Sequence, residues 1–207
     1  MRAGITRFTF IIGLTCLLLG CESKSLSNLN GTLLNPSLEI DDFSLLSAGE
    51  TLKISDFEGK FVVLAFGYTY CPDACPTTMA RLASTMRLLG EQADQVQVVL
   101  VSVDEQRDSP DKLAAYTEAF NDTFKGVWVS KPDSSAFFST LGIYHERAVP
   151  TEVVSTEAAA ENTEEYLIDH TTSTIVLDRE GNWRLVWNFE LSAEEMAFDL
   201  SRLIKHY

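Results

Sequence analysis

Two cysteines separated by three residues are the part of this sequence best suited to chemistry. Cys71 and Cys75 stand in the segment CPDACP at positions 71–76, directly after an apolar run. Two thiols at this spacing can form a disulfide or hold one metal ion between them. Thiol–disulfide oxidoreductases usually have two residues between their cysteines. The wider spacing permits a disulfide and also separates the sulfur atoms for a metal, so both kinds of site remain open.

A histidine far along the chain completes a candidate set of metal ligands. His170 lies just before a predicted strand that begins at Thr172. Two thiolates and one imidazole suit Cu(I), and the same set also accommodates Cu(II). A single histidine is ordinarily a surface or hydrogen-bonded residue, and it is the position of His170 that favours a ligand role. His145 is a second candidate, as an auxiliary ligand, and His206 near the C-terminus is expected to be solvated.

The cysteine pair follows a predicted strand and precedes a predicted helix. Residues 61–67 are an uninterrupted apolar run, as expected of a strand covered on both faces. Residues 76–89 carry apolar side chains at helical spacing, and Gly90 ends the pattern. Both thiols then lie at the carboxyl end of a strand, where open α/β sheets place their ligands. Pro76 suits the first helical position, which puts Cys75 near the N-cap, where unpaired backbone N–H groups favour a thiolate.

The elements that follow alternate and then end in a hairpin. Residues 96–103 are predicted as a strand, 110–120 as a helix, 126–129 as a short strand, 132–141 as a helix, 172–177 and 183–187 as an antiparallel hairpin, and 191–206 as an amphipathic helix. Alternation of strands and helices implies a parallel sheet with helices on its faces. With the terminal hairpin, the pattern predicts an α/β, thioredoxin-like fold: a mixed central sheet flanked by helices, with a C-terminal antiparallel hairpin and helix. In that fold the loop that holds His170 faces the cysteine loop.

The N-terminus has the pattern of a bacterial lipoprotein signal. Two arginines precede an apolar run over residues 8–19, which is shorter than the roughly 20 residues of a membrane span. The run ends in Leu-Leu-Gly-Cys at 18–21, which resembles a lipobox. Residues 1–20 are therefore predicted to be a signal peptide and Cys21 the lipidated residue; an uncleaved signal anchor is the alternative. We expect a lipid-anchored protein of the cell membrane, with its domain on the periplasmic or extracytoplasmic side.

One folded domain is expected after this signal. The chain has 207 residues, and 45% of them are hydrophobic, enough for a substantial core. Residues 21–37 begin with a stretch rich in Ser and Asn and are predicted to form a flexible tether, and residues 38–207 the domain. Residues 151–165 contain several glutamates and no aromatic residue, and they are predicted to be a variable surface loop.

Cysteine usage points to chemistry at the remaining pair. Of the four cysteines, Cys16 would be lost with the signal and Cys21 would carry the lipid, which leaves Cys71 and Cys75 in an oxidising compartment. A bridge between residues so close in sequence closes too small a loop to contribute much stability.

The charge of the chain excludes one class of partner. The formal net charge is −14 at pH 7, and a surface this acidic repels phosphate. Nucleic-acid binding is therefore not expected. The simplest role of the acidic surface is to keep the protein soluble.

Three segments together resemble the Sco/SenC family. They are residues 66–76, residues 101–110, and the pair 169–170 followed by residues 174–178; the similarity extends from about residue 38 to residue 207. The resemblance implies a thioredoxin-like fold and one copper ion per domain, as Cu(I), Cu(II) or both, bound by Cys71, Cys75 and His170. Many members have His where Tyr70 stands and Pro where Glu105 stands, and neither departure removes a ligand.

The resemblance leads to two expected functions. The first is a copper-binding assembly factor, a metallochaperone rather than an enzyme, that takes copper from a periplasmic donor and delivers it to the CuA-bearing subunit of cytochrome c oxidase. The alternative is a membrane-anchored thiol–disulfide reductase acting on the copper-site cysteines of the oxidase, in which Cys71 or Cys75 attacks a target disulfide and the other resolves it. That activity needs a thiol reductant as partner and does not need His170. A peroxidase or redox sensor would need acid–base support for which the sequence offers little.

Several charged residues lie near the predicted site. Asp104, Arg107 and Asp108 follow the second apolar strand, so they are expected at the same edge of the sheet. They are candidates for hydrogen bonds that support the site or orient a partner, and helix capping with local ion pairs is the alternative. Asp73, between the cysteines, either tunes the thiolates or forms the turn.

Overall fold

The computed structural model describes residues 26, 28–148 and 166–207. Its strands are β1 (Thr32–Leu38), β2 (Ser44–Ser47), β3 (Glu50–Lys53), β4 (Phe61–Gly67), β5 (Val96–Ser102), β6 (Lys125–Val129), β7 (His145–Ala148), β8 (Leu167–His170), β9 (Thr174–Leu177) and β10 (Trp183–Trp187). Its helices are α1 (Ala74–Leu89), α2 (Pro110–Glu118), α3 (Lys131–Thr140) and α4 (Ala193–His206), with short 3-10 turns η1 (Ile54–Phe57) and η2 (Gly90–Gln95).

The main sheet is mixed, as the sequence predicts. Within the described residues its strand order is β1-β10-β9-β4-β5-β6-β2-β3, and β7 pairs with β8 in a separate two-stranded sheet. Strands β4, β5 and β6 run parallel, whereas β9 lies antiparallel to β4 and β10 antiparallel to β9. The C-terminal hairpin β9–β10 and helix α4 confirm the predicted end of the fold.

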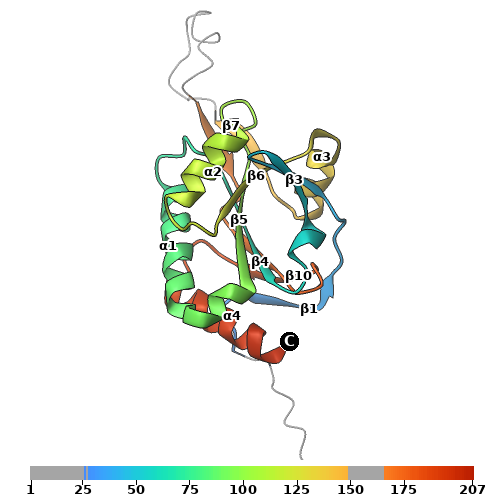
Figure 1. Ribbon diagram of the computed structural model, residues 1–207, viewed down its shortest axis with the longest axis vertical. Coiled ribbons are helices and arrows are strands. Elements are labelled where there is room, and N and C mark those ends of the chain that lie inside the picture. Colours follow the sequence, from blue (N-terminus) through green and yellow to red (C-terminus); the bar gives the residue numbers. More distant parts are fainter. Residues whose placement is uncertain (1–25, 27, 149–165) are drawn as a thin grey trace, which may run out of the picture.

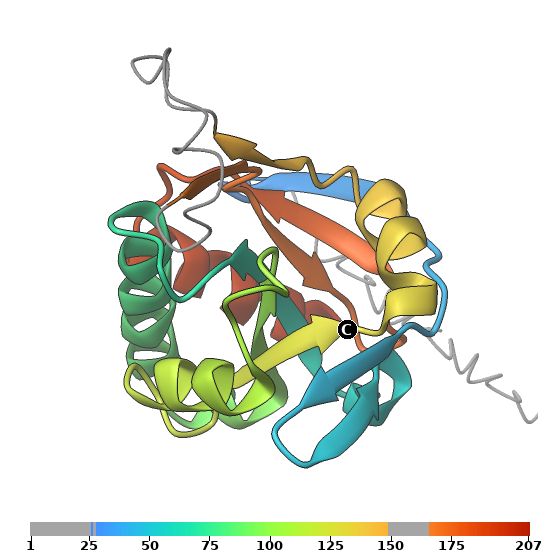
Figure 2. The ribbon, with the colours of Figure 1, turned by 90° about the horizontal axis from the view of Figure 1, so that it is seen from above.

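The central strands are buried on both faces because each face is covered by helices. Alternate residues of β4 point to opposite sides: Phe61, Val63 and Ala65 belong to one core cluster, whereas Val62, Leu64 and Phe66 belong to the other. The first cluster also holds apolar residues of α1, α2 and α4, and the second those of α3 and η1. Figure 2 shows α1 and α3 on opposite sides of the sheet.

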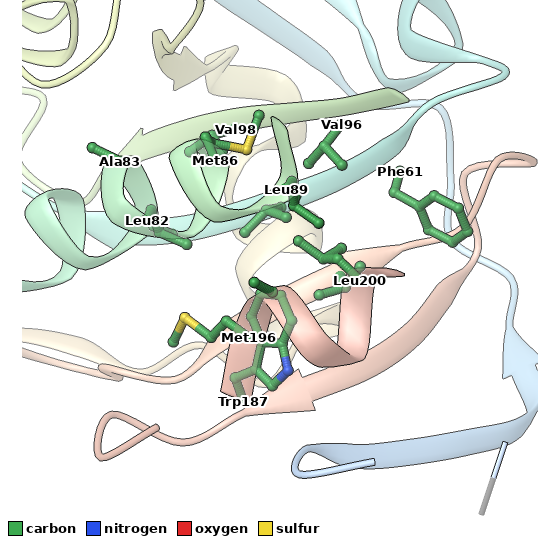
Figure 3. Close-up of a cluster of buried hydrophobic side chains, with 14 of the residues drawn as sticks. Phe61, Leu82, Ala83, Met86, Leu89, Val96, Val98, Trp187, Met196 and Leu200 are labelled. Atoms are coloured by element: carbon green, nitrogen blue, oxygen red, sulfur yellow. The ribbon is translucent and has the colours of Figure 1, made fainter. Parts of the chain in front are cut away.

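Helix α4 closes the first of these clusters. Met196 and Leu200 of α4 pack together with Leu82 and Leu89 of α1 and with Trp187 of β10 (Figure 3). Trp187 has no solvent-exposed surface. The C-terminal helix and hairpin therefore belong to the same core as the helix that carries Cys75.

The first strand corrects the predicted tether. Residues 32–37, predicted to belong to the flexible tether, lie in β1, which pairs antiparallel with β10 at the edge of the sheet. The prediction relied on the polar composition of the segment, and an edge strand with a solvent-exposed side can have such a composition. The folded domain therefore begins before residue 38. The predicted signal peptide 1–20, the lipidation site Cys21, the start of the tether and the loop 151–165 lie outside the described residues.

A buried carboxylate holds this N-terminal segment in place. Asp199 of α4 is fully buried and accepts hydrogen bonds from the backbone N–H groups of Asn30 and Gly31, at 2.8 and 2.9 Å, and from the Trp187 indole at 2.9 Å. These bonds connect the chain before β1 to both α4 and β10. The sequence contains no pattern that singles out Asp199.

Most of the other predicted elements have bounds that differ by one or two residues from those of the structure. The strand predicted at 172–177 begins at Thr174, and the helix predicted to begin at Pro76 begins at Ala74. Hairpin β7–β8 was not predicted, because four-residue strands with few apolar residues give little periodicity. Among the helices of the described residues, none combines the length and hydropathy required to cross a membrane.

We predict that Asp199→Ala lowers the free energy of unfolding by about 2–4 kcal/mol, because it leaves buried N–H groups without an acceptor. Urea denaturation of the full chain measures the change. Glu194→Gln, an exposed change on the same helix, is the matched control and is expected to stay within about 0.5 kcal/mol of the parent. Equal effects from the two variants would contradict the anchoring role.

Candidate metal centre

The two cysteines and the distant histidine converge at one point. The Sγ atoms of Cys71 and Cys75 and one ring nitrogen of His170 all lie within 4.8 Å of one another. The distance from Cys75 Sγ to His170 Nε2 is 3.5 Å, although the two residues are 95 positions apart in sequence. In the described residues this is the one group of three such side chains close enough to share a metal ion.

The start of α1 positions the sulfur atoms, but not as the sequence predicts. Asp73 is the N-cap, without a side-chain capping bond, so Cys75 lies inside the first helical turn rather than at the cap. The backbone N–H of Cys75 donates to Cys71 Sγ at 3.3 Å. A backbone donor in the first turn of the helix therefore supports the sulfur of Cys71.

Burial controls the ionisation of Cys75. Its side chain is 3% exposed. Removal from water, and then the interaction with Cys71, raise the pKa of the Cys75 thiol. The expectation that Cys75 is a stabilised thiolate is therefore wrong for the metal-free protein. The helix N-terminus does not compensate for the loss of solvation at this depth.

A glycine makes room for this buried sulfur. A Cβ atom at Gly67, the last residue of β4, would lie 2.7 Å from Cys75 Sγ and 3.2 Å from Cys75 Cβ. Any larger residue would therefore displace Cys75. In the sequence Gly67 is only the last residue of an apolar run, and the packing alone shows its role.

The orientation of the His170 ring leaves Nε2 available to bind a metal ion beside the cysteines. His170 is the last residue of β8, not part of a loop before the hairpin. Its Nδ1 lies 2.9 Å from the carbonyl oxygen of Thr171, which can only accept a hydrogen bond. Nδ1 therefore carries the proton, and the lone pair of Nε2 points toward the sulfur atoms. A backbone carbonyl behind the ring is a common way of orienting a histidine ligand.

A tyrosine next to the cysteine loop holds β8 against it. Tyr68 is 2% exposed, and its hydroxyl accepts a hydrogen bond from the backbone N–H of Ile168 at 3.0 Å. Its ring also meets the His170 ring edge-on, with 5.9 Å between centroids. Tyr68 thus connects the end of β4 directly to the strand that carries His170. No local sequence pattern singles out this residue.

Arg107 and Asp104 form a second connection to the same strand. Arg107 donates through Nη1 to the Tyr166 carbonyl at 2.8 Å, and its guanidinium lies over the Tyr166 ring, 3.5 Å from the centroid. Asp104 is buried, forms an ion pair with Arg107 and accepts from the Tyr166 hydroxyl at 2.6 Å. The loop after β5 therefore fixes the start of β8.

Asp108 supports the cysteine loop itself. It is 2% exposed and accepts hydrogen bonds from the Thr69 backbone and hydroxyl and from the Ser102 hydroxyl. Asp104, Arg107 and Asp108 thus support the site through hydrogen bonds, as the first interpretation predicts, and the Asp104–Arg107 pair is also the local ion pair of the alternative. The capping of α2 is done by Ser109 instead.

The other candidate residues lie outside the three-ligand group. Asp73 is exposed, and its backbone carbonyl accepts from the Thr77 N–H, which fits the turn-forming role. His206 lies at the end of α4, whereas β7, which begins at His145, lies at the opposite end of the molecule (Figure 1). His145 is directly opposite His170 in the β7–β8 pairing.

The fold and the site define a class of protein. It is an α/β protein with two cysteines at the carboxyl end of a central strand and a histidine in the separate two-stranded sheet β7–β8. A family model described as SCO1/SenC matches residues 33–205. The chain therefore belongs to the SCO1/SenC family. A curated relative, the mitochondrial SCO2 homolog of Mus musculus, is 28% identical over 166 residues, which are 79% of this chain and 61% of the relative.

Solved structures confirm the thioredoxin-like fold. Apo Sco1 from Thermus thermophilus has a TM-score of 0.70 at 29% identity, covering 86% of this chain and 97% of that one. Copper-bound ScoI from Bradyrhizobium japonicum has a TM-score of 0.66 at 29% identity, covering 79% of this chain and 98% of that one. The similarity thus includes one metal-free protein and one copper-bound protein.

We predict that Tyr68→Phe destabilises the fold by about 1–3 kcal/mol, because the Ile168 N–H loses its acceptor in a buried position. The measurement is urea denaturation, together with NMR of the His170 ring, whose signals should broaden or shift as β8 loosens. Tyr70→Phe is the matched control, since Tyr70 is 50% exposed. Identical behaviour of the two variants would show that the Tyr68 hydroxyl does not hold β8.

Proposed function

We propose that this protein binds one copper ion with Cys71, Cys75 and His170 and delivers it to the CuA centre of cytochrome c oxidase. The observation that carries the proposal is the convergence of two sulfur atoms and the His170 Nε2 lone pair within 4.8 Å. Copper-bound ScoI, a relative with the same fold, supports the choice of metal. The copper is cargo: it arrives from a periplasmic donor and leaves for the oxidase.

The donor set suits copper that must be both held and released. Thiolates are soft ligands that favour Cu(I), and imidazole binds copper in either oxidation state. Cys75 is buried, whereas Cys71 and His170 are only partly covered. A partner can therefore approach the ion from the side of Cys71 and His170 and replace the ligands one at a time.

The place of action follows from the N-terminal pattern. We propose that Cys21 carries a lipid and that the domain stands on the extracytoplasmic side of the cell membrane. On that side the domain would meet its proposed partners: the CuA-bearing subunit, and a periplasmic copper donor or thiol reductant. Residues 1–25 are outside the described part of the chain, so the sequence pattern alone supports this proposal.

Reduction of the oxidase's copper-site cysteines is the second candidate function. Its support is that Cys71 and Cys75 are both free thiols, with the more exposed Cys71 sulfur accepting the Cys75 N–H. Cys71 would attack a target disulfide, form a mixed disulfide and release one target thiolate. Cys75 would then attack Cys71, which leaves a Cys71–Cys75 disulfide and a target reduced by two electrons.

We predict that His170→Ala weakens copper binding of the full chain in detergent by at least about tenfold and removes or shifts the thiolate charge-transfer band of the Cu(II) form. His206→Ala is the matched control, since His206 lies at the opposite end of the molecule. Copper is titrated against a competing chelator. Dithiol exchange with a model disulfide should persist in His170→Ala.

The same titration separates the two candidate functions. If the reduced parent protein binds no copper while it still reduces the model disulfide, copper delivery is wrong and the reductase is supported. If copper binds and His170→Ala abolishes the binding, the metal site is supported.

Copper binding is also predicted to strengthen as the pH rises. Burial raises the pKa of the Cys75 thiol, so this group is protonated at neutral pH in the metal-free protein, and copper must displace its proton. Each displaced proton gives about a tenfold gain in apparent affinity per pH unit below that pKa. Chelator competition between about pH 6 and pH 8 measures the slope. A pH-independent affinity would contradict proton displacement.

A further inference from the structure

A second imidazole stands next to the one in the metal centre. In the β7–β8 pairing, His145 is the direct partner of His170. Tyr144 and Thr171 form the adjacent cross-strand pair. This pair is hydrogen-bonded, because the Thr171 N–H donates to the Tyr144 carbonyl at 2.9 Å. Hydrogen-bonded and non-hydrogen-bonded pairs alternate in antiparallel strands, so His145 and His170 form a non-hydrogen-bonded pair. Side chains in such a pair approach most closely, with Cβ atoms about 4.5–5.5 Å apart.

Both imidazoles lie on the face of the hairpin that turns toward the domain. Residues two apart in a strand share a face, and Ile168, two before His170, is buried in the core. The ring of His145 contacts Phe138 of α3, with 4.5 Å between centroids. Glu146 and Asp169, which alternate with the histidines, are exposed and point the other way.

His145 is exposed to solvent, and its ring nitrogens are available to bind a metal ion. Neither of its nitrogens makes a hydrogen bond to any residue that the structure describes. It lines a cleft of about 380 Å³ between α3, the loop after β5 and the β7–β8 hairpin, together with Glu105, Ser134 and Phe138. His145 is outside the set of atoms that lie within 4.8 Å of one another, so it is not a fourth ligand of that centre.

We propose that His145 and His170 form a two-imidazole site that holds copper during its passage between the cleft and the cysteines. The proposal rests on the proposed function, because it assigns a route to the same cargo. His170 belongs to both sites and keeps its bond to the metal. The Cu–N bond to His145 forms as the Cu–S bonds to Cys71 and Cys75 break, and the reverse occurs on loading.

No electron moves in this exchange. The copper keeps its oxidation state, and each released thiolate takes up a proton from solvent. Two neutral imidazoles hold copper less strongly than a pair of thiolates and an imidazole, which suits an intermediate stage. Transfer through a shared ligand also avoids release of the free ion into water.

The test removes the cysteine site and asks whether the histidine pair binds copper by itself. The Cys71→Ser/Cys75→Ser double variant of the full chain in detergent is titrated with Cu(II) and followed by EPR. We expect one bound Cu(II) with hyperfine coupling to two imidazole nitrogens. Adding His145→Ala should weaken this binding by at least about tenfold and remove one nitrogen coupling.

Two controls make the result specific. His206→Ala in the same double variant should leave the binding and the spectrum unchanged. His145→Gln keeps a polar side chain of similar size at this exposed position and should reproduce the loss, which excludes a folding defect as the cause. Equal effects of His145→Ala and His206→Ala would overturn the proposal.

A kinetic measurement tests the route in the chain with both cysteines. His145→Ala should slow the release of copper to an external chelator by about tenfold; an unchanged rate overturns the transit role. Failure here is distinguishable from failure of the proposed function. The latter is decided by His170→Ala in the parent chain, whereas the two-imidazole site is decided by His145→Ala in a protein that lacks both cysteines.

Discussion

The attachment of strand β8 to the cysteine loop is the interaction on which the metal centre depends. The Tyr68 hydroxyl accepts the Ile168 N–H, and Arg107 binds the Tyr166 carbonyl, so both ends of the segment before His170 are fixed to loops that follow the central strands. These contacts bring a nitrogen to within 3.5 Å of a sulfur that is 95 positions away. Without these contacts, nothing would hold the His170 ring beside the two cysteines.

The environment of the site balances binding against release. Cys75 is buried, and its raised pKa keeps the metal-free thiol neutral, which avoids an unpaired charge in the core. In the proposed copper site, the ion would supply the positive charge that stabilises a Cys75 thiolate at that depth. Cys71 and His170 stay within reach of a partner. The proposed copper site would therefore have one inaccessible ligand and two accessible ones, an arrangement that fits the proposed transfer by ligand exchange.

Hairpin β7–β8 extends this reasoning beyond the three ligands. One of its strands supplies His170, and the other places His145 in the adjacent cross-strand position, beside a cleft that opens to solvent. A short two-stranded element outside the main sheet thus carries two imidazoles to the same edge. The main sheet contributes the rigid support, and the added hairpin contributes the histidines.

The sequence by itself determined the main strands and helices, because their apolar periodicity is strong. Residues 61–67 and 183–187 are strands with the predicted bounds. It also predicted that Cys71, Cys75 and His170 are candidate metal ligands, since thiols and imidazoles are few and their chemistry is distinctive, and the structure places these three side chains together. Only the tertiary structure decided what depends on contacts between distant segments. Such contacts place Cys75 inside the first turn of α1, require glycine at position 67, give Tyr68 and Asp199 their roles, and put His145 opposite His170. Side-chain packing and hydrogen bonds between segments far apart in sequence leave no local pattern, so no periodicity or motif could have shown them.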